Sequence, residues 1–330
     1  MPQSIFSNSI WLTITKAAKF LTPLLILPYL IQKIGFQNVG LIAFAEAISQ
    51  TILVISDYGF PLSATKQVSI KRDSEKSLRS IVSSIVFIKS IIFAFVFLFL
   101  LILLALNIYE EKIISLYFLM SFMLLGNMFT FAWFFQGIED SRALVLSQLC
   151  SSLVTIAGIY FFVNSESDFL FAPLFYAIGS LLGGLISQLY VLNFIKWKLE
   201  FKFDDIIHQL KDGFVIFIAY LSMSSYSNLN VILLGLLTNN FIVAQYKIIL
   251  TIVNAAAEVL SPISASVYAR LVFIRKNSHK RFTKKFKNIY SKILPLYISI
   301  SLILLIAPLK VASLLGYTTS ELDIVNLRLL

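Results

Sequence analysis

The sequence predicts an all-α membrane protein that crosses the bilayer many times. Of its 330 residues, 58% are hydrophobic and 13% are charged, and the mean hydropathy is +0.86. A soluble domain of average composition carries about 25% charged residues. The apolar residues also fall in runs that are long enough to cross about 30 Å of hydrocarbon as helices. Together these observations indicate lipid as the main solvent and about ten helices.

Nine apolar runs have the length of a membrane-spanning helix, which needs about 20 residues. They cover residues 10–32, 38–62, 81–106, 113–135, 143–163, 170–194, 213–236, 240–268 and 292–315. No small-residue cleavage site follows the first run, so we do not expect a signal peptide. Residues 316–330 resemble the opening of a tenth helix. A helix that stops in hydrocarbon leaves its last carbonyls unpaired, so we expect a truncated reading frame or fragment.

Lys and Arg gather in every second connection between the runs. The connections after runs two, four, six and eight hold most of them, whereas those after runs one, three, five and seven hold only Lys33 and Lys112. By the positive-inside rule, the N-terminus and the basic connections are cytoplasmic. The segment from Arg275 to Lys287 is expected to contact anionic membrane lipids. The net charge of +10 therefore does not predict nucleic acid as a partner.

An internal repeat predicts two lobes. A shift that places Lys71 on Arg275 also places run one on run seven and run two on run eight. Six runs, an even number, separate the copies, so both point the same way across the membrane. This predicts two parallel six-helix lobes with a solute path between them. Residues 1–195 would form the N-terminal lobe, 196–212 a cytoplasmic linker, and 213–330 an incomplete C-terminal lobe of three spans and the start of a fourth.

Three strings carry a resemblance to a known family. Run two begins after Ile34-Gly35 and ends in Asp57-Tyr58-Gly59-Phe60-Pro61, and run four ends in Phe134-Phe135-Gln136-Gly137-Ile138-Glu139. The chain resembles, over nearly its whole length, the O-antigen flippases (Wzx type) and related polysaccharide exporters of the superfamily that includes the MATE transporters. This resemblance implies a MATE-like two-lobe helical bundle in the bacterial inner (plasma) membrane, here with its second lobe truncated.

The resemblance also implies a substrate and partners. An undecaprenyl-diphosphate-linked oligosaccharide, a repeat unit of O-antigen or of another surface polysaccharide, would move from the cytoplasmic to the periplasmic leaflet by alternating access. A polysaccharide polymerase and chain-length proteins would be partners. No cofactor is implied.

Four lysines within the runs are candidate contacts for the diphosphate: Lys16, Lys19, Lys89 and Lys247. An ionisable residue in a span costs about 2.5–3.5 kcal/mol to insert, which makes it a functional candidate by default. Lys16 and Lys19 share one face of the first run, where they either line a cationic lumen or extend toward the headgroups. Lys89 has the same two interpretations.

Four acids are candidates for coupling or gating: Glu46, Asp57, Glu139 and Glu258. Under the repeat shift, Lys247 falls about one turn from Glu46, and Glu258 about one turn from Asp57. We therefore expect Glu46 to face Lys247 across the two lobes, either as a pair that switches between access states or as a structural salt bridge. For Asp57 we favour a cap on the backbone N–H groups of the following Tyr58-Gly59 break. Glu139 is expected to pair with Arg142.

The remaining candidates are Tyr226, Asn228 and Asn230, which either bind sugar hydroxyls or join helices by hydrogen bonds. The sequence has no Gly-rich phosphate loop and no clustered metal ligands, so we predict neither an enzyme nor a metal site. A MATE-type multidrug cation antiporter is the alternative, although lumen lysines disfavour it. A membrane glycosyltransferase would need large external loops, and an inactive truncated product is a third alternative.

Overall fold

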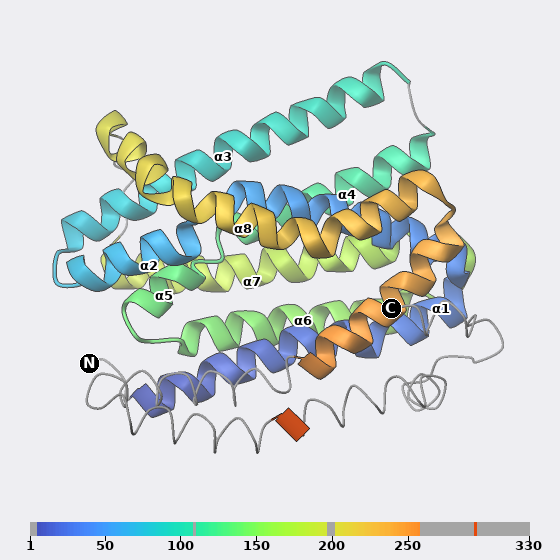
Figure 1. The fold of residues 1–330 in the computed structure, drawn as a ribbon, viewed down its shortest axis with the longest axis horizontal. Coiled ribbons are helices and arrows are strands. Elements are labelled where there is room, and N and C mark those ends of the chain that lie inside the picture. The colour runs from blue at the N-terminus through green and yellow to red at the C-terminus, as the bar shows by residue number, and fades with distance from the viewer. Residues whose placement is uncertain (1–4, 108–109, 197–201, 258–293, 296–330) are drawn as a thin grey trace.

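The computed structural model describes residues 5–107, 110–196, 202–257 and 294–295, and every regular element in these ranges is a helix. The long helices lie side by side along the longest axis of the molecule (Figure 1). They are α1 (Ile5–Asp57), α2 (Phe60–Lys71), α3 (Glu75–Ala105), α4 (Glu111–Met128), α5 (Ala132–Gly137), α6 (Arg142–Phe162), α7 (Phe171–Ile195) and α8 (Phe203–Leu237), with the short 3-10 helix η1 (Glu166–Asp168) and an unlabelled helix over Asn240–Ala257.

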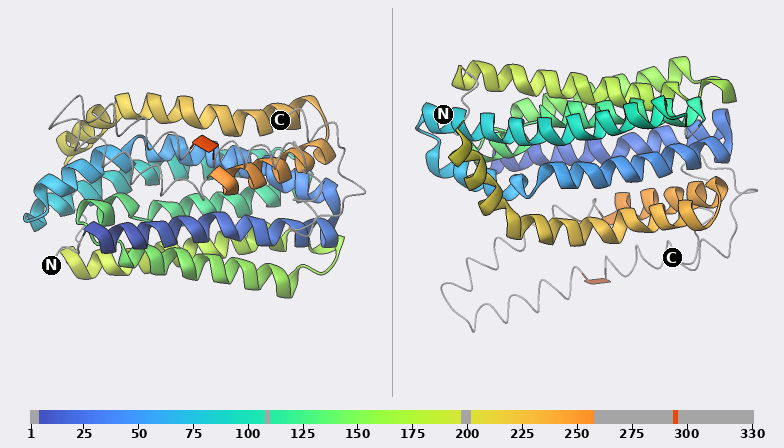
Figure 2. Two further views of the ribbon diagram at one scale, coloured as in Figure 1. Left: turned by 60° about the horizontal axis from the view of Figure 1, so that its bottom comes forward. Right: turned by 90° about the horizontal axis from the view of Figure 1, so that it is seen from above.

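Helix α1 contains two antiparallel segments joined at Gly35. The backbone there has φ 75° and ψ 167°, a conformation that is essentially restricted to glycine because a Cβ would clash with the backbone. The chain reverses direction at this residue (Figures 1 and 2). The first and second predicted runs are therefore the two arms of α1. We call them the first arm (residues 5–34) and the second arm (residues 36–57).

The described helices overlap the first seven predicted runs and the part of the eighth that ends at Ala257. Seven helical stretches in the described part are long and apolar enough to cross a membrane, and the longest, Ile10–Lys71, contains both arms of α1 and continues into α2. Large apolar side chains such as Phe95, Phe161 and Val215 are exposed on the outside, as expected for a lipid-facing surface. The prediction of an all-α multi-pass membrane protein is confirmed. Apart from residues 294–295, the ninth run lies outside the described residues, as does the start of a tenth helix.

Two boundaries differ from the predicted runs. The fourth run is broken between α4 and α5. In the break, the N–H of Phe131 donates a hydrogen bond to the Ser187 hydroxyl of α7 at 3.0 Å. A side chain from another helix thus replaces the lost backbone bond, which makes a helix break tolerable in a membrane. Helix α8 begins at Phe203, so the last residues of the predicted linker are helical.

Helix α7 packs between α4 and α6 through small residues. The Ser147 hydroxyl of α6 donates to the Gly183 carbonyl of α7 at 2.6 Å, so the two backbones lie close together. Tyr29 of the first arm of α1 stacks on Tyr160 of α6, with the ring centroids 4.2 Å apart. These contacts join the first arm of α1, α4, α6 and α7 into one packed unit, against which the second arm and α8 are placed.

Candidate functional site

A charged pair joins the second arm of α1 to the helix over Asn240–Ala257. Lys247 Nζ lies 2.9 Å from Glu46 Oε2, and the two side chains are 20% and 25% exposed. At a rise of 1.5 Å per residue, Lys247 lies about 10 Å along its helix from Asn240, and Glu46 about 16 Å from Gly35. Both residues lie inside helices that are long and apolar enough to cross a membrane, where a charge needs a partner. The structure thus brings together the two residues that the repeat predicts to face each other.

The same two helices are in tight contact toward the Gly35 end. A Cβ on Gly40 would lie 1.7 Å from the Asn240 carbonyl oxygen, so only glycine permits this approach. The rings of Phe36 and Phe241 contact each other with centroids 5.0 Å apart. The cavity beside Glu46 and Lys247 has a volume of only about 20 Å³, room for about one water molecule. In this conformation the two helices are therefore closed against each other at that end.

A second charged pair lies within the N-terminal part of the bundle. Lys89 Nζ of α3 is 2.6 Å from Asp57 Oδ1 at the end of α1, and it also donates to Asn127 Oδ1 of α4 at 3.4 Å. Lys89 is 3% exposed, whereas Asp57 is 32% exposed. The ammonium is thus enclosed between three helices. The sequence offered a cationic lumen or the headgroup level for Lys89 and did not predict this pairing with Asp57.

Two expected local contacts of the acids are wrong. Helix α2 begins after Gly59, and no side chain caps its first turn, because the Asp57 carboxylate faces Lys89 instead. Glu139 lies 3.6 Å from the Arg72 guanidinium, whereas Arg142 pairs with Asp140 at 3.1 Å. Asp57 and Glu139 each pair with a residue distant in sequence, whereas Arg142 pairs with Asp140, which is nearer in sequence than Glu139.

The other predicted site residues are not brought together with these pairs in the described part of the chain. Lys16 and Lys19 are exposed on the first arm of α1. Asn230 of α8 donates to the Tyr246 hydroxyl at 3.2 Å, which is a contact between helices, and Asn228 is half-buried. The side chain of Tyr226 and all of Glu258 lie outside the described residues. The roles of all these residues stay predictions.

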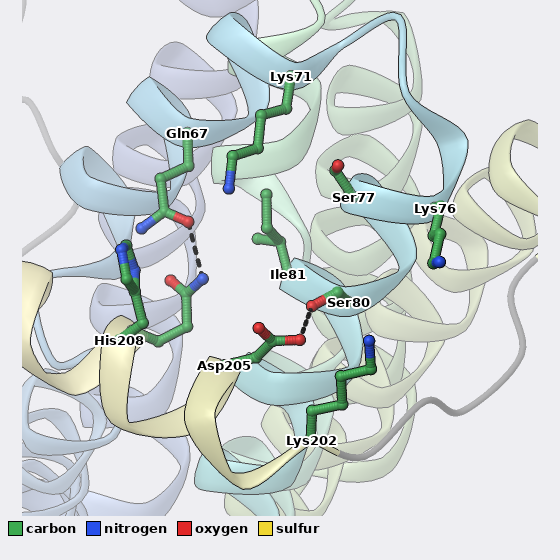
Figure 3. Close-up of a pocket in the computed structure, with 10 residues that line it drawn as sticks. Gln67, Lys71, Lys76, Ser77, Ser80, Ile81, Lys202, Asp205 and His208 are labelled. Carbon is green, nitrogen blue, oxygen red and sulfur yellow. Dashed lines mark hydrogen bonds between the residues drawn. The ribbon is translucent and has the colours of Figure 1, made fainter.

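A polar cluster between α2 and the start of α8 is absent from the sequence-based candidates. Asp212 accepts a hydrogen bond from Gln67 Nε2 at 3.0 Å, and Gln67 Oε1 accepts one from Gln209 Nε2 at 2.7 Å. Ser80 of α3 donates to the Asp205 carboxylate nearby. All of these residues except Asp212 border a cavity of about 230 Å³ that is also lined by lysines (Figure 3). The sequence feature that could have identified this cluster was Gln67, a polar residue one turn after Ser63 on the same short helix.

Among the described residues, no three His, Cys, Asp or Glu side chains lie close enough together to hold a metal ion. What the described site offers is paired charges between helices and hydrogen-bonding groups at one end of the bundle. Such an arrangement can bind and release charged groups, and it contains no assembled nucleophile with its base.

A family model described as polysaccharide biosynthesis protein matches residues 5–272 of the chain. The chain is similar to a protein of Escherichia coli (strain K12) named "Putative O-antigen transporter", with 30% identity over 272 residues, 81% of this chain. A protein of the same name from Shigella dysenteriae is 26% identical over 266 residues, 80% of this chain. The chain spans 65% and 66% of the lengths of these two relatives.

Solved structures show a similar fold. A multidrug resistance MATE family transporter of the MOP superfamily, in an inward-facing conformation, matches with a TM-score of 0.62 at 11% identity, over 95% of this chain and 76% of that one. A MATE protein in a bent conformation matches with a TM-score of 0.53 at 14% identity, over 98% of this chain and 76% of that one. The likeness extends to the fold, and the predicted MATE-like bundle is confirmed.

Proposed function

Because the chain belongs to the polysaccharide biosynthesis protein family, we propose that it moves an undecaprenyl-diphosphate-linked oligosaccharide across the bacterial inner membrane. The two relatives are named as O-antigen transporters, which supports export of a surface polysaccharide unit and not an enzymatic reaction. In this proposal the N-terminus is cytoplasmic, and residues 1–195 and 213–330 belong to two lobes that alternate access between the leaflets.

The observation that carries the proposal is the ion pair between Glu46 and Lys247. It joins one helix from each proposed lobe, at a depth where a charge needs a partner. When the lobes separate, the two charges need other partners, which an anionic diphosphate supplies for Lys247. The pair therefore couples the presence of substrate to the opening of the contact. Lys16 and Lys19 on the first arm are proposed to receive the same diphosphate, with Lys89, Asp57 and Glu139 as further candidates.

A flipping assay with charge variants tests the proposal. The purified chain is placed in liposomes with an undecaprenyl-diphosphate oligosaccharide that carries a fluorophore on its sugar, and an impermeant reductant bleaches the outer leaflet. A flippase raises the bleached fraction from about half toward all of the lipid. We expect Glu46→Gln and Lys247→Gln to slow flipping at least tenfold, and Glu46→Lys/Lys247→Glu to recover much of the rate.

Two further arms test the cationic path. Lys16→Gln/Lys19→Gln is expected to slow flipping, whereas Lys33→Gln, a cation at the opposite end of the same arm, should leave it unchanged. If the bleached fraction stays at about half, the share of the outer leaflet, when the liposomes contain the unaltered chain, the proposed substrate is contradicted. If the same liposomes accumulate an organic cation drug instead, the antiporter alternative is the correct one.

A further inference from the structure

The cavity between α2, α3 and the start of α8 carries a separate inference. It lies at the end of the bundle that the charge distribution predicts to be cytoplasmic, opposite the Gly35 end. Its volume of about 230 Å³ has room for on the order of seven water molecules, and therefore for a phosphate group with a short polyol. Neither the Glu46–Lys247 pair nor the Asp57–Lys89 pair borders it.

Three lysines line the cavity, each from a different position in the chain. Lys71 ends α2, Lys76 lies in the first turn of α3, and Lys202 precedes α8. Lys71 and Lys202 extend toward the cavity from opposite sides (Figure 3). Within the described ranges none of the three ammonium groups has an ion-pair partner.

The other charged groups leave this excess in place. Asp205 is the only carboxylate that lines the cavity among the described residues, and it accepts a hydrogen bond from Ser80. His208 lies 3.4 Å from Asp212, so the charge that His208 carries when protonated is balanced locally. Three ammonium groups against one carboxylate leave a surplus of two positive charges. An anion with one or two negative charges fits this surplus.

A buried acceptor specifies a second property of the ligand. The Asp212 carboxylate only accepts hydrogen bonds, so the amide nitrogen of Gln67 must face it, and the Gln67 oxygen then faces the amide nitrogen of Gln209. This chain of bonds fixes the orientation of the Gln209 amide. Gln209 is 3% exposed, and its Oε1 is buried without a hydrogen-bond partner in the described structure. That oxygen has no accessible surface in this conformation, so a ligand hydroxyl satisfies it only when the Gln209 amide turns toward the cavity that this residue lines.

We propose that this cavity binds a phosphate ester that bears free hydroxyl groups, supplied by the headgroup of an anionic phospholipid such as phosphatidylglycerol. The phosphate oxygens accept hydrogen bonds from the lysines, and a glycerol hydroxyl donates to Gln209 Oε1. Basic pockets between helices at the cytoplasmic surface suit anionic headgroups. A bound headgroup joins α2 and α3 to the start of α8, where the cavity-lining residues Asp205, His208 and Gln209 belong to the proposed linker. The binding site stands independently of the transported substrate.

Native mass spectrometry of the purified full chain in detergent, titrated with phosphatidylglycerol, tests the proposal. The variant Lys71→Gln/Lys76→Gln/Lys202→Gln removes the three cavity lysines. Lys66→Gln/Lys112→Gln/Lys211→Gln removes the same charge from exposed lysines outside the cavity and serves as its control. Each headgroup-bound lysine contributes about fivefold to affinity, so the cavity variant should bind phosphatidylglycerol on the order of 100-fold more weakly.

The control variant should bind phosphatidylglycerol with an affinity within about twofold of that of the unaltered chain. Phosphatidylcholine should bind all three proteins with affinities that differ by no more than about twofold. An equal loss of phosphatidylglycerol affinity in the cavity and control variants would show that the lipid adsorbs to general surface charge, and it would overturn the proposed site. Unaltered thermal unfolding of the cavity variant shows that it is folded. If that variant unfolds, the single variant Lys76→Gln, at an exposed first-turn position, takes its place with an expected fivefold loss.

Two further arms separate the ligand sources and test the hydroxyl. Soluble glycerol 3-phosphate that displaces phosphatidylglycerol at micromolar concentration would identify a free solute and overturn the lipid source. Gln209→Met keeps the side-chain volume and removes the acceptor, so the affinity ratio of phosphatidylglycerol to phosphatidic acid, which lacks the glycerol hydroxyls, should fall about fivefold. An unchanged ratio contradicts the hydroxyl contact.

Discussion

At the scale of single residues, the two ion pairs between helices differ in how their members are exposed. Glu46 and Lys247 are similarly exposed, whereas Lys89 is almost completely enclosed and its partner Asp57 keeps contact with the exterior. An enclosed charge that loses its partner has no water to replace it, while a partly exposed one does. The two partners of the Asp57–Lys89 pair should therefore respond unequally to substitution.

We expect Asp57→Leu to destabilise the protein by about 3–5 kcal/mol, because it leaves Lys89 buried and unpaired. Lys89→Met should cost about 1 kcal/mol, since the carboxylate of Asp57 is partly solvated and Met fills the space of the lysine stem. Chemical unfolding of the purified protein in detergent measures both values.

The double variant Asp57→Leu/Lys89→Met completes the cycle and should be more stable than Asp57→Leu alone. Equal effects of the two single variants, or a double variant as unstable as their sum, would contradict a pair that is held together by charge.

The sequence predicts one of these pairs and not the other. Glu46 and Lys247 occupy nearly equivalent positions in the two copies of a repeat, so the shift alone places them near each other. Asp57 and Lys89 are not related in this way. Local rules favour a capping role for Asp57, and only the packing of α3 on α1 and α4 brings an ammonium to its carboxylate.

At the scale of elements, the reversal in α1 depends on one residue. The conformation at Gly35 is restricted to glycine, but an added Cβ would make only an ordinary van der Waals contact, 3.6 Å from Glu166 Oε1. The cost of a substitution at Gly35 is therefore backbone strain and not a steric overlap with another helix.

We predict that Gly35→Ala lowers the free energy of unfolding by about 1–3 kcal/mol through this strain. Gln37→Ala, at an exposed helical position two residues later, is the matched control and should change it by less than about 0.5 kcal/mol. Thermal unfolding in detergent compares the two. A Gly35→Ala variant as stable as the control would show that the reversal is not fixed at this residue.

At this scale the existence of the helices and the break at Tyr58-Gly59 are predictable, whereas the break before α5 is not. Apolar runs mark the long helices because every segment that crosses lipid must satisfy its own backbone bonds and present apolar side chains. The break before α5 does not follow from the local sequence, because the hydroxyl that satisfies Phe131 belongs to Ser187 on another helix.

At the scale of the whole molecule, the proposed transport cycle requires the Gly35 end to open. Phe36 and Phe241 touch across the two proposed lobes, whereas Tyr29 and Tyr160 touch within the first one. Linking the first pair should block a movement between lobes, and linking the second should not. The two pairs of rings are thus a matched test of alternating access.

We predict that Phe36→Cys/Phe241→Cys, in a Cys150→Ser background, loses flipping when the thiols are joined by a short bifunctional methanethiosulfonate, and regains it on reduction. Tyr29→Cys/Tyr160→Cys treated in the same way should keep its activity. The fluorescent flipping assay measures both before and after reduction. Full activity of the linked Phe36–Phe241 variant would rule out opening at this end.

The sequence by itself determined the all-α class and the Glu46–Lys247 contact, and it predicts nine runs and a cytoplasmic N-terminus. These depend on hydropathy, charge counts and a repeat, which act along the chain. Tertiary structure alone decided the partner of Lys89, the break before α5 and the cavity shared by Lys71, Lys76 and Lys202. Each of these joins side chains that are distant in sequence. Their energies depend on which groups become neighbours once water is excluded, and no local pattern encodes that.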